Sequence, residues 1–106
     1  MNQLQKVFNY QGNQLRTVVI DNEPWFVAKD VCDILGIGNI TWAMNRLDED
    51  EFSSTKVTDN IGRKQEFKIV NEPGLYSLIL GSRKPEAKQF KRWITHEVIP
   101  SIRKHG

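Results

Sequence analysis

Four polar side chains within eight residues are of the types that read DNA bases: Asn39, Thr41, Asn45 and Arg46. An Asn amide can form two hydrogen bonds with adenine, Arg can do the same with guanine, and Thr can meet a phosphate or a thymine methyl group. The stretch 30–47 around them has the pattern of a helix-turn-helix. Cys32 is small where two helices would cross, and Gly36 lies in the turn, where positive φ is needed.

The spacing of this stretch resembles the DNA-binding helix pair of lactose-repressor-like regulators. In that geometry the second helix lies in the major groove and presents its first residues to base edges. The same pattern also fits two packed helices around a glycine turn with no DNA role. The second helix contains one basic residue, Arg46, and the acidic run 48–51 follows it. That run would repel phosphate unless it points away from the DNA.

A second basic group lies near the C-terminal end. Residues 81–106 contain seven Lys and Arg against two acidic residues, whereas residues 1–80 contain eight against eleven, within a net charge of +2. On a helix that opens at Pro85, the basic residues would lie on one side and meet DNA phosphates. The expected contacts are Lys84, Lys88, Lys91 and Arg92, with Arg103, Lys104 and the earlier Lys29. The alternative is a solvated helix face.

Other kinds of chemistry find little support. One cysteine and two histidines exclude a disulfide framework and a Cys-rich zinc site, and the acidic run 48–51 lacks the spaced ligands of a calcium loop. Asp30 and Asp33 near a helix start are interpreted as capping and dipole compensation, and Cys32 as a buried, inert thiol. Phosphate-loop, dinucleotide and nucleophile-elbow motifs are absent from the sequence. We therefore expect no enzyme, no cofactor and no metal site.

The elements that position these residues follow from apolar spacing and turn residues. A chain of 106 residues with 39% hydrophobic and 26% charged residues predicts one small α+β domain. A β-meander is expected at 7–10, 15–20 and 25–27, the helix pair at 28–35 and 40–47, and a second hairpin at 52–58 and 65–70. Two C-terminal helices follow, one capped by Asn71 and stopped by Gly81, the other running from Pro85 to about Ile99. Pro100 should kink or end the last helix, and the three tryptophans should be core or partly buried.

Three ordered blocks, 25–36, 71–79 and 82–106, resemble the N-terminal domain of the BRO family, found in prophage antirepressors and large DNA viruses. Pro73 departs from the Ser or Ala usual in the second block. The resemblance implies a DNA-binding domain over residues 1–106, part of an antirepressor-type transcription regulator and usually joined to a variable C-terminal domain. Its partner would be double-stranded DNA.

An alternative function is a protein-interaction module that sequesters a phage repressor without binding DNA. It predicts an exposed apolar patch around Trp42 and Met44. A nucleic-acid-processing enzyme would need converging carboxylates or a metal site. If the helix pair is used as in repressors, a two-fold homodimer is expected. With no long apolar run and no signal-peptide pattern, we expect no membrane partner and a location in the cytoplasm of a bacterial host.

Overall fold

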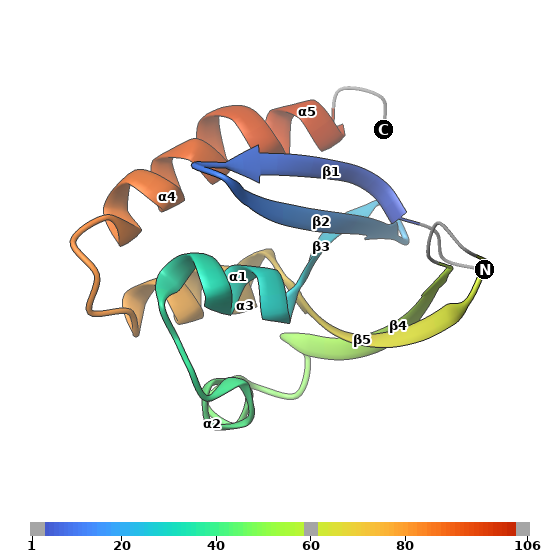
Figure 1. Ribbon diagram of the computed structural model, residues 1–106, viewed down its shortest axis with the longest axis horizontal. Coiled ribbons are helices and arrows are strands. Elements are labelled where there is room, and N and C mark those ends of the chain that lie inside the picture. The colour runs from blue at the N-terminus through green and yellow to red at the C-terminus, as the bar shows by residue number, and fades with distance from the viewer. Residues whose placement is uncertain (1–3, 59–61, 104–106) are drawn as a thin grey trace.

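The computed structural model describes residues 4–58 and 62–103. In these ranges five strands form one antiparallel sheet in the order β1-β2-β3-β5-β4 (Figure 1). The strands are β1 (Leu4–Tyr10), β2 (Asn13–Ile20), β3 (Glu23–Val27), β4 (Phe52–Thr58) and β5 (Lys64–Asn71). The predicted meander and second hairpin are confirmed, although the three meander strands begin earlier than expected. Residues 59–61 of the predicted hairpin turn lie outside the described residues.

The two meander turns have the backbone that tight hairpins require. Gln11 and Gly12 have φ of 51° and 86°, and Asp21 and Asn22 have φ of 52° and 67°. Two successive residues with positive φ match the right-handed twist of the flanking strands. The Asn9 side chain accepts a hydrogen bond from the Gly12 amide at 3.0 Å. These local turns hold β1 and β2 against β3.

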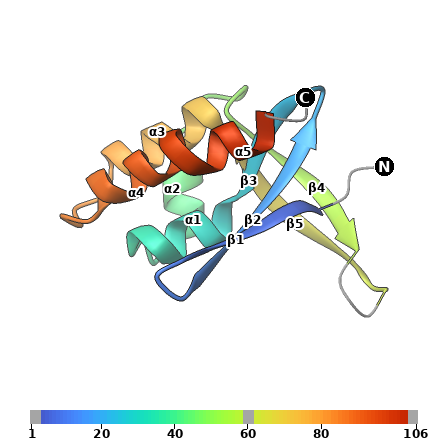
Figure 2. The same ribbon diagram turned by 90° about the horizontal axis from the view of Figure 1, so that it is seen from above.

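The helices are α1 (Ala28–Leu35), α2 (Ile40–Met44), α3 (Glu72–Leu80), α4 (Ala87–Trp93), the π-helical turn η1 (Ile94–Val98) and α5 (Ile99–Arg103). Helix α3 contacts both α1 and α4, and both α1 and α3 pack against β5. Seen from above, α3 and the α4–α5 helix run side by side (Figure 2). The α+β architecture expected from the sequence is therefore confirmed.

The core lies between the sheet and these helices. The apolar stripe of α1, with Val31, Ile34 and Leu35 at i, i+3 and i+4, is buried together with Phe26 of β3 and Leu75 of α3. The two predicted caps are also confirmed. Gly36 ends α1 with φ of 72°, and the Asn71 side chain accepts a hydrogen bond from the Gly74 amide at 3.0 Å. Apolar periodicity and cap residues thus fix where α1 and α3 lie.

Helix α2 is shorter than the predicted 40–47. It begins after Asn39, whose side chain accepts a hydrogen bond from the Trp42 amide as expected, and it ends at Met44. The next amides, of Arg46 and Leu47, bond to carbonyls only three residues earlier, which tightens the backbone into turns. The chain must turn here because β4 begins at Phe52 and pairs with β5.

The last helix also differs from the prediction at both ends. It begins at Ala87 rather than Pro85, and it continues through Pro100 to Arg103. Pro100 has no N–H for the His96 carbonyl, and a proline ring crowds that carbonyl in a regular helix. The chain accommodates the proline with the wider η1 turn, in which the Ile99 amide bonds to the Ile94 carbonyl. Of the two expected outcomes, an end at Pro100 is not observed, because the chain stays helical through the proline with an irregular turn before it.

Two expectations about single side chains are corrected. Trp25 and Trp93 are half-buried, but Trp42 is 53% exposed, because it lies on the outer side of the short α2. Met44, expected with Trp42 in an exposed patch, is buried. The exposed apolar surface near Trp42 is instead completed by Leu80 of α3, which is 82% exposed.

Candidate nucleic-acid interface

Helix α4 presents three cations on its outer side. Ala87 and Phe90 are buried against the fold, so Lys88, Lys91 and Arg92 are exposed at spacings of three and four residues. Residues at these spacings are neighbours on a helix surface. No ion pair joins any of the three to a carboxylate within the described residues. Their charge is therefore available to an anionic partner.

An aromatic cluster anchors α4 to the first hairpin. The Trp93 ring lies 6.1 Å from Phe8 and 4.8 Å from Tyr10, measured between centroids, and Phe90 lies 5.3 Å from Tyr10. Such pairs add roughly 0.5–1.5 kcal/mol each beyond the apolar area they bury. Trp93 is thus a packing residue, as the sequence favoured. The cluster fixes the rotation of α4 and turns its basic side outward.

Lys91 leans from α4 toward α3. Its Nζ lies 5.8 Å from the centroid of the Tyr76 ring, within the range of a cation–π contact. Among the described residues, Lys88 and Arg92 make no cation–π contact. The three cations therefore have different freedom, with Lys91 the most constrained.

Lys84 does not belong to the α4 surface in the way the sequence suggested. It precedes the helix, and its Nζ lies 3.5 Å from the Ile34 carbonyl oxygen at the end of α1. Its Cε would lie 2.6 Å from a Cβ added at Gly36. A cation at a helix C-terminus interacts favourably with the carbonyl dipoles there. In this structure Lys84 therefore stabilises the C-terminal end of α1.

Lys29 and Arg103 come from elements other than α4. Lys29 is exposed on α1, with its Nζ 3.9 Å from the Asp33 carboxylate one turn later, so its charge is partly compensated. Arg103 is the last residue of α5, and Lys104 lies outside the described residues.

The helix-turn-helix-like segment has limited means of reading bases. Asn39, Thr41, Asn45 and Arg46 are all exposed, but α2 has only five residues. The Asn39 oxygen is occupied by capping, and Asn45 ends the helix. The Arg46 guanidinium lies over the Trp42 ring, 4.9 Å from its centroid.

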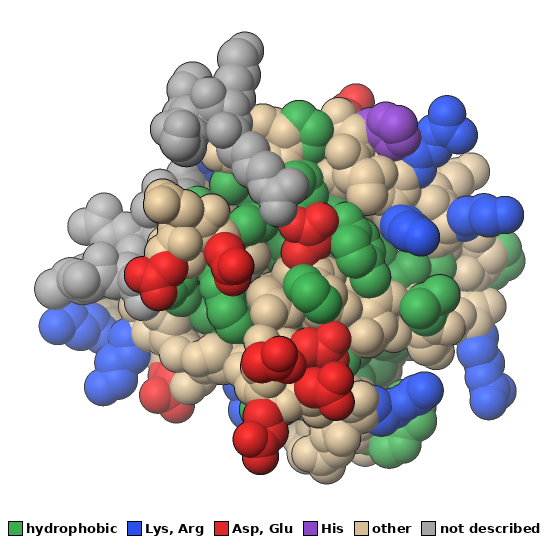
Figure 3. All heavy atoms as spheres, turned by 180° about the vertical axis from the view of Figure 1, so that it is seen from behind, with side chains coloured by type: hydrophobic (Ala, Val, Ile, Leu, Met, Phe, Trp, Pro, Cys, Tyr) green, Lys and Arg blue, Asp and Glu red, His purple; other side chains and the backbone are tan. Residues whose placement is uncertain are grey.

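Acidic side chains follow this segment directly. Asp48, Glu49 and Asp50 are exposed, and the Glu51 carboxylate accepts a hydrogen bond from the Asp48 amide at 2.9 Å. Seen from behind, Asp and Glu side chains occupy the middle of the molecular surface, whereas Lys and Arg lie toward its sides (Figure 3). The charges are thus segregated, which disfavours the acidic face as a DNA contact.

Sequence reasoning missed two polar neighbours of Arg92. Gln89, Arg92, Trp93, His96 and Glu97 line a shallow hollow of 300 Å³ on α4 and η1. Gln and Arg side chains can bond base edges as well as phosphates. The i, i+3, i+7 spacing of Gln89, Arg92 and His96 was the signal that could have found them.

Sequence reasoning also missed a buried ion pair. The Asp30 carboxylate accepts hydrogen bonds from the Arg16 side chain, twice at 2.8 Å, and from its backbone amide at 2.9 Å. These bonds raise the pKa of Arg16 above its usual value, against the opposing effect of burial. The Arg16 guanidinium also lies 4.5 Å from the centroid of the Phe67 ring. Asp30 therefore fastens α1 to β2, and the capping interpretation was wrong, because no side chain caps α1.

Cys32 is fully buried on the packing side of α1, as predicted. Burial, with a smaller contribution from the charge of Asp33, raises the pKa of Cys32 to about 11. Within residues 4–58 and 62–103 no group of three or more metal-ligating side chains comes together. In the same ranges no helix is long and apolar enough to cross a membrane.

Comparisons with known proteins identify the family. The model of the BRO family N-terminal domain matches residues 14–100. An uncharacterised protein of Haemophilus influenzae is 41% identical over 108 residues, which cover 99% of this chain and 53% of that protein. Two proteins of Invertebrate iridescent virus 6, 201R and 289L, described as containing a Bro-N domain, are 30% and 32% identical. These matches cover 92% and 93% of this chain and 28% of each viral protein.

The chain thus spans about half the length of the bacterial relative and less than a third of the viral ones. No solved structure is significantly similar to it. The family model extends from the first residues of β2 to the proline inside α5 and includes all of α1, α2, α3, α4 and η1. The chain therefore belongs to the BRO family, and the fold described above is that of a BRO N-terminal domain.

Proposed function

We propose that residues 1–106 form a DNA-binding domain of an antirepressor-type transcription regulator, acting in the cytoplasm of the host cell. The α4 side chains Lys88, Lys91 and Arg92 would contact the phosphates of double-stranded DNA. The observation that carries the proposal is their exposure on one helix side, with no carboxylate paired to them within the described residues. Membership of a family associated with viral and phage antirepressor-like proteins supports it.

In this proposal α4 makes most of the contacts with DNA, and the α2 segment makes fewer. Phosphate contacts position a protein on DNA, and base contacts supply specificity. Gln89 and His96, which line one hollow with Arg92, would be the side chains that reach base edges once the phosphates are bound. Thr41 and Asn45 would contact DNA only if the duplex passes α2 without approaching the exposed acidic residues 48–50.

The test is duplex-DNA binding by fluorescence anisotropy over a range of salt concentrations. One duplex should have a phage promoter sequence and the other a random sequence. The unchanged chain should bind at micromolar concentration or tighter, with an affinity that falls steeply with salt. The variant Lys88→Glu/Arg92→Glu should lose most of this affinity, and the log–log salt slope should fall by about 2, since each phosphate contact contributes about 0.9.

A matched variant, Lys64→Glu/Lys68→Glu, makes the same change of net charge on exposed positions of β5. It should keep the salt slope of the unchanged chain. Equal loss in the two variants would mean that only net charge matters, and unchanged affinity in a folded α4 variant would exclude α4 as the contact. Circular dichroism verifies the fold of each variant.

A further inference from the structure

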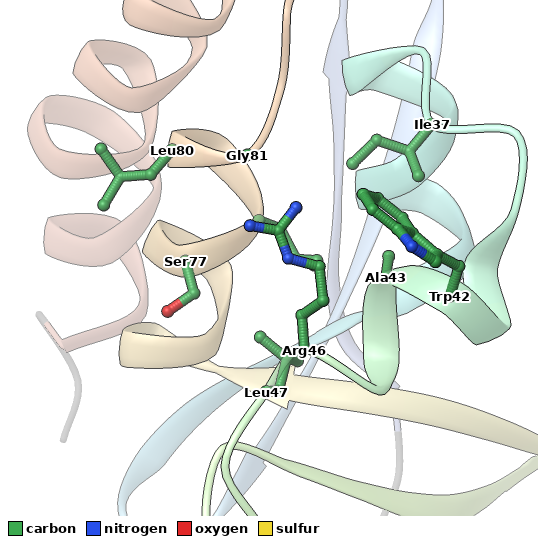
Figure 4. Close-up of a pocket in the computed structure, with 9 residues that line it drawn as sticks. Ile37, Trp42, Ala43, Arg46, Leu47, Ser77, Leu80 and Gly81 are labelled. Atoms are coloured by element: carbon green, nitrogen blue, oxygen red, sulfur yellow. The ribbon is translucent and has the colours of Figure 1, made fainter.

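A second surface lies between α2 and α3, away from the α4 cations. It is a hollow of 290 Å³ whose lining residues are mostly apolar in type, with Arg46 and Ser77 among them (Figure 4). Trp42 and Leu80, two of the large apolar residues that the described part of the chain leaves exposed, stand on opposite sides of it. Ile37, Leu47 and Leu78 complete the apolar lining. Exposed apolar side chains that converge on a hollow mark an interaction site better than scattered ones do.

One cation is held inside this α2–α3 groove. The Arg46 guanidinium carbon lies 4.9 Å from the centroid of the Trp42 ring, and Nη1 lies 3.3 Å from the place of a Cβ at Gly81. The side chain therefore rises between Trp42 and the C-terminal end of α3 (Figure 4). Helix α3 has no basic residue in its own last turn, so Arg46 also compensates the dipole there.

The Arg46 guanidinium has N–H donors that no carboxylate of the described residues occupies. Within the described residues no carboxylate pairs with Arg46, although the acidic run 48–51 begins two residues later. Arg presents five N–H donors in a fixed fork that matches a carboxylate. The stacking on Trp42 orients the fork in advance, which lowers the entropy lost on binding.

The residues that line the α2–α3 groove indicate which kind of anionic partner it can bind. A DNA backbone would lay a continuous run of charged phosphates and sugars against side chains that are mostly apolar, whereas a protein segment has to bring only one charge to Arg46. At 290 Å³ the hollow is at the lower limit of small-molecule sites, which span roughly 300–1,000 Å³. Trp42 and Leu80 extend the apolar surface beyond the hollow, which suits the flank of a protein segment.

We propose that the α2–α3 groove binds a segment of a partner protein that inserts one large apolar side chain between Trp42 and Leu80 and places a carboxylate against Arg46. This proposal does not depend on DNA binding by α4. It assigns Arg46 to a protein partner rather than to a base.

Nuclear magnetic resonance of the ¹⁵N-labelled chain tests the groove directly. The probe is the blocked peptide acetyl-Ala-Phe-Ala-Glu-Ala-amide, in which Phe and Glu lie on the same side of an extended backbone. The control peptide replaces Glu with Gln and keeps the shape without the charge. The indole N–H signal of Trp42, identified with Trp42→Phe, should shift on titration. The Glu peptide should bind at least tenfold more tightly than the Gln peptide.

Variants separate the apolar and ionic parts of this site. Arg46→Gln should make the two peptides bind equally, and Leu80→Asn should weaken both. Because Leu80 is 82% exposed, its replacement leaves the core intact. Two controls outside the groove, Val7→Asn at an exposed apolar residue and Lys88→Gln at an exposed cation, should change neither affinity.

Five outcomes would overturn the proposal. Equal binding of the Glu and Gln peptides, or no shift at roughly 20 mM peptide, a concentration that detects even very weak sites, would show no such recognition. Shifts that depend on protein concentration alone would identify a second copy of the chain as the occupant. Tighter binding of inorganic phosphate or a dinucleotide would identify nucleic acid. Equal binding of free N-acetylphenylalanine would identify a small ligand.

Discussion

Asp30 and Arg16 form a polar contact of three hydrogen bonds between α1 and β2. The Asp30 side chain is 3% exposed and that of Arg16 is 19% exposed. Asp30→Asn removes the charge and leaves the guanidinium facing a neutral amide, which should cost about 2–3 kcal/mol of unfolding free energy. Urea denaturation measures the loss.

Asp33→Asn is the matched control for this change. Asp33 lies on the same helix, but its side chain is 56% exposed and its contact with Lys29 is 3.9 Å long. Its replacement should alter stability by less than about 0.5 kcal/mol. Similar losses at Asp30 and Asp33 would contradict the importance given to the buried pair.

Cys32 should be unreactive in the folded chain. With its pKa raised to about 11, the thiol is neutral near pH 8, and it is fully buried. Ellman's reagent should modify it far more slowly than a free thiol, and denaturant should restore the rate, since the thiolate is the reactive form. Above the unfolded pKa the unfolded state releases its proton first, so this group lowers stability as pH rises toward 11. Rapid modification without denaturant would contradict the burial.

The junction of α1 with the following loop depends on the backbone of Gly36. Its φ of 72° is costly for residues with a side chain, so Gly36→Ala should destabilise the domain by about 1 kcal/mol. A Cβ there would also meet Lys84 at 2.6 Å, but that contact is with the far end of a flexible side chain. Lys84→Ala in the Gly36→Ala background should therefore not restore the lost stability in thermal denaturation.

Gly38, two residues later, provides the control for this substitution. It has no positive φ, and nothing lies within 4 Å of an added Cβ. Gly38→Ala should be neutral or slightly stabilising, because it reduces the freedom of the unfolded chain. A loss as large as that at Gly36 would show that the loop needs both glycines for another reason.

At this scale, the elements with strong local signals were predictable from the sequence. Helices α1 and α3 have apolar spacing and recognisable caps at Gly36 and Asn71, and the meander has turn residues between apolar runs. The end of α2 was not predictable, because the start of β4 and its pairing with β5 decide it. The η1 turn was missed because a proline is tolerated in a helix when the backbone before it widens.

The residues of the candidate sites, like the secondary-structure elements, were only partly predictable from the sequence. Exposure of Lys88, Lys91 and Arg92 follows from helix periodicity and was predicted. The exposure of Trp42 and the position of Arg46 beside it depend on where α3 packs, which no local pattern states. The Arg16–Asp30 pair joins residues 14 apart on different elements, and each looks like a surface charge in the sequence.

In the described part of the chain the buried apolar residues form one core cluster, which includes Phe26. Phe26 is fully buried on β3, the strand that pairs with both β2 and β5. Phe26→Ala should cost about 3–5 kcal/mol, a large share of the 5–15 kcal/mol typical of a domain. The near-ultraviolet and far-ultraviolet melting curves should shift together, since one core unfolds as a unit.

Val7→Ala is the control at this scale. Val7 is 53% exposed on the outer strand β1, so its truncation should leave both melting curves nearly unchanged. Separate shifts of the two curves in Phe26→Ala would contradict a single cooperative core.

The three blocks that resemble the BRO family meet in this core. The first contains β3 and α1, the second the end of β5 with α3, and the third the long helix from α4 to α5. β3 pairs with β5, α1 contacts α3, and α3 contacts α4. The family pattern therefore describes a packed centre, while both proposed binding surfaces lie on its outside.

The pairing of β3 with β5 also bears on how quickly the chain folds. Only three residue pairs join these strands, Trp25 with Asn71, Phe26 with Val70 and Val27 with Ile69. The meander and the β4–β5 hairpin each close over short loops, in microseconds, whereas this pairing must enclose the whole chain between 28 and 68. Proteins dominated by such distant contacts fold more slowly than those with local ones. We therefore expect the two hairpins to form first and their pairing at β3 and β5 to be the slow step by which a newly made chain becomes a folded domain.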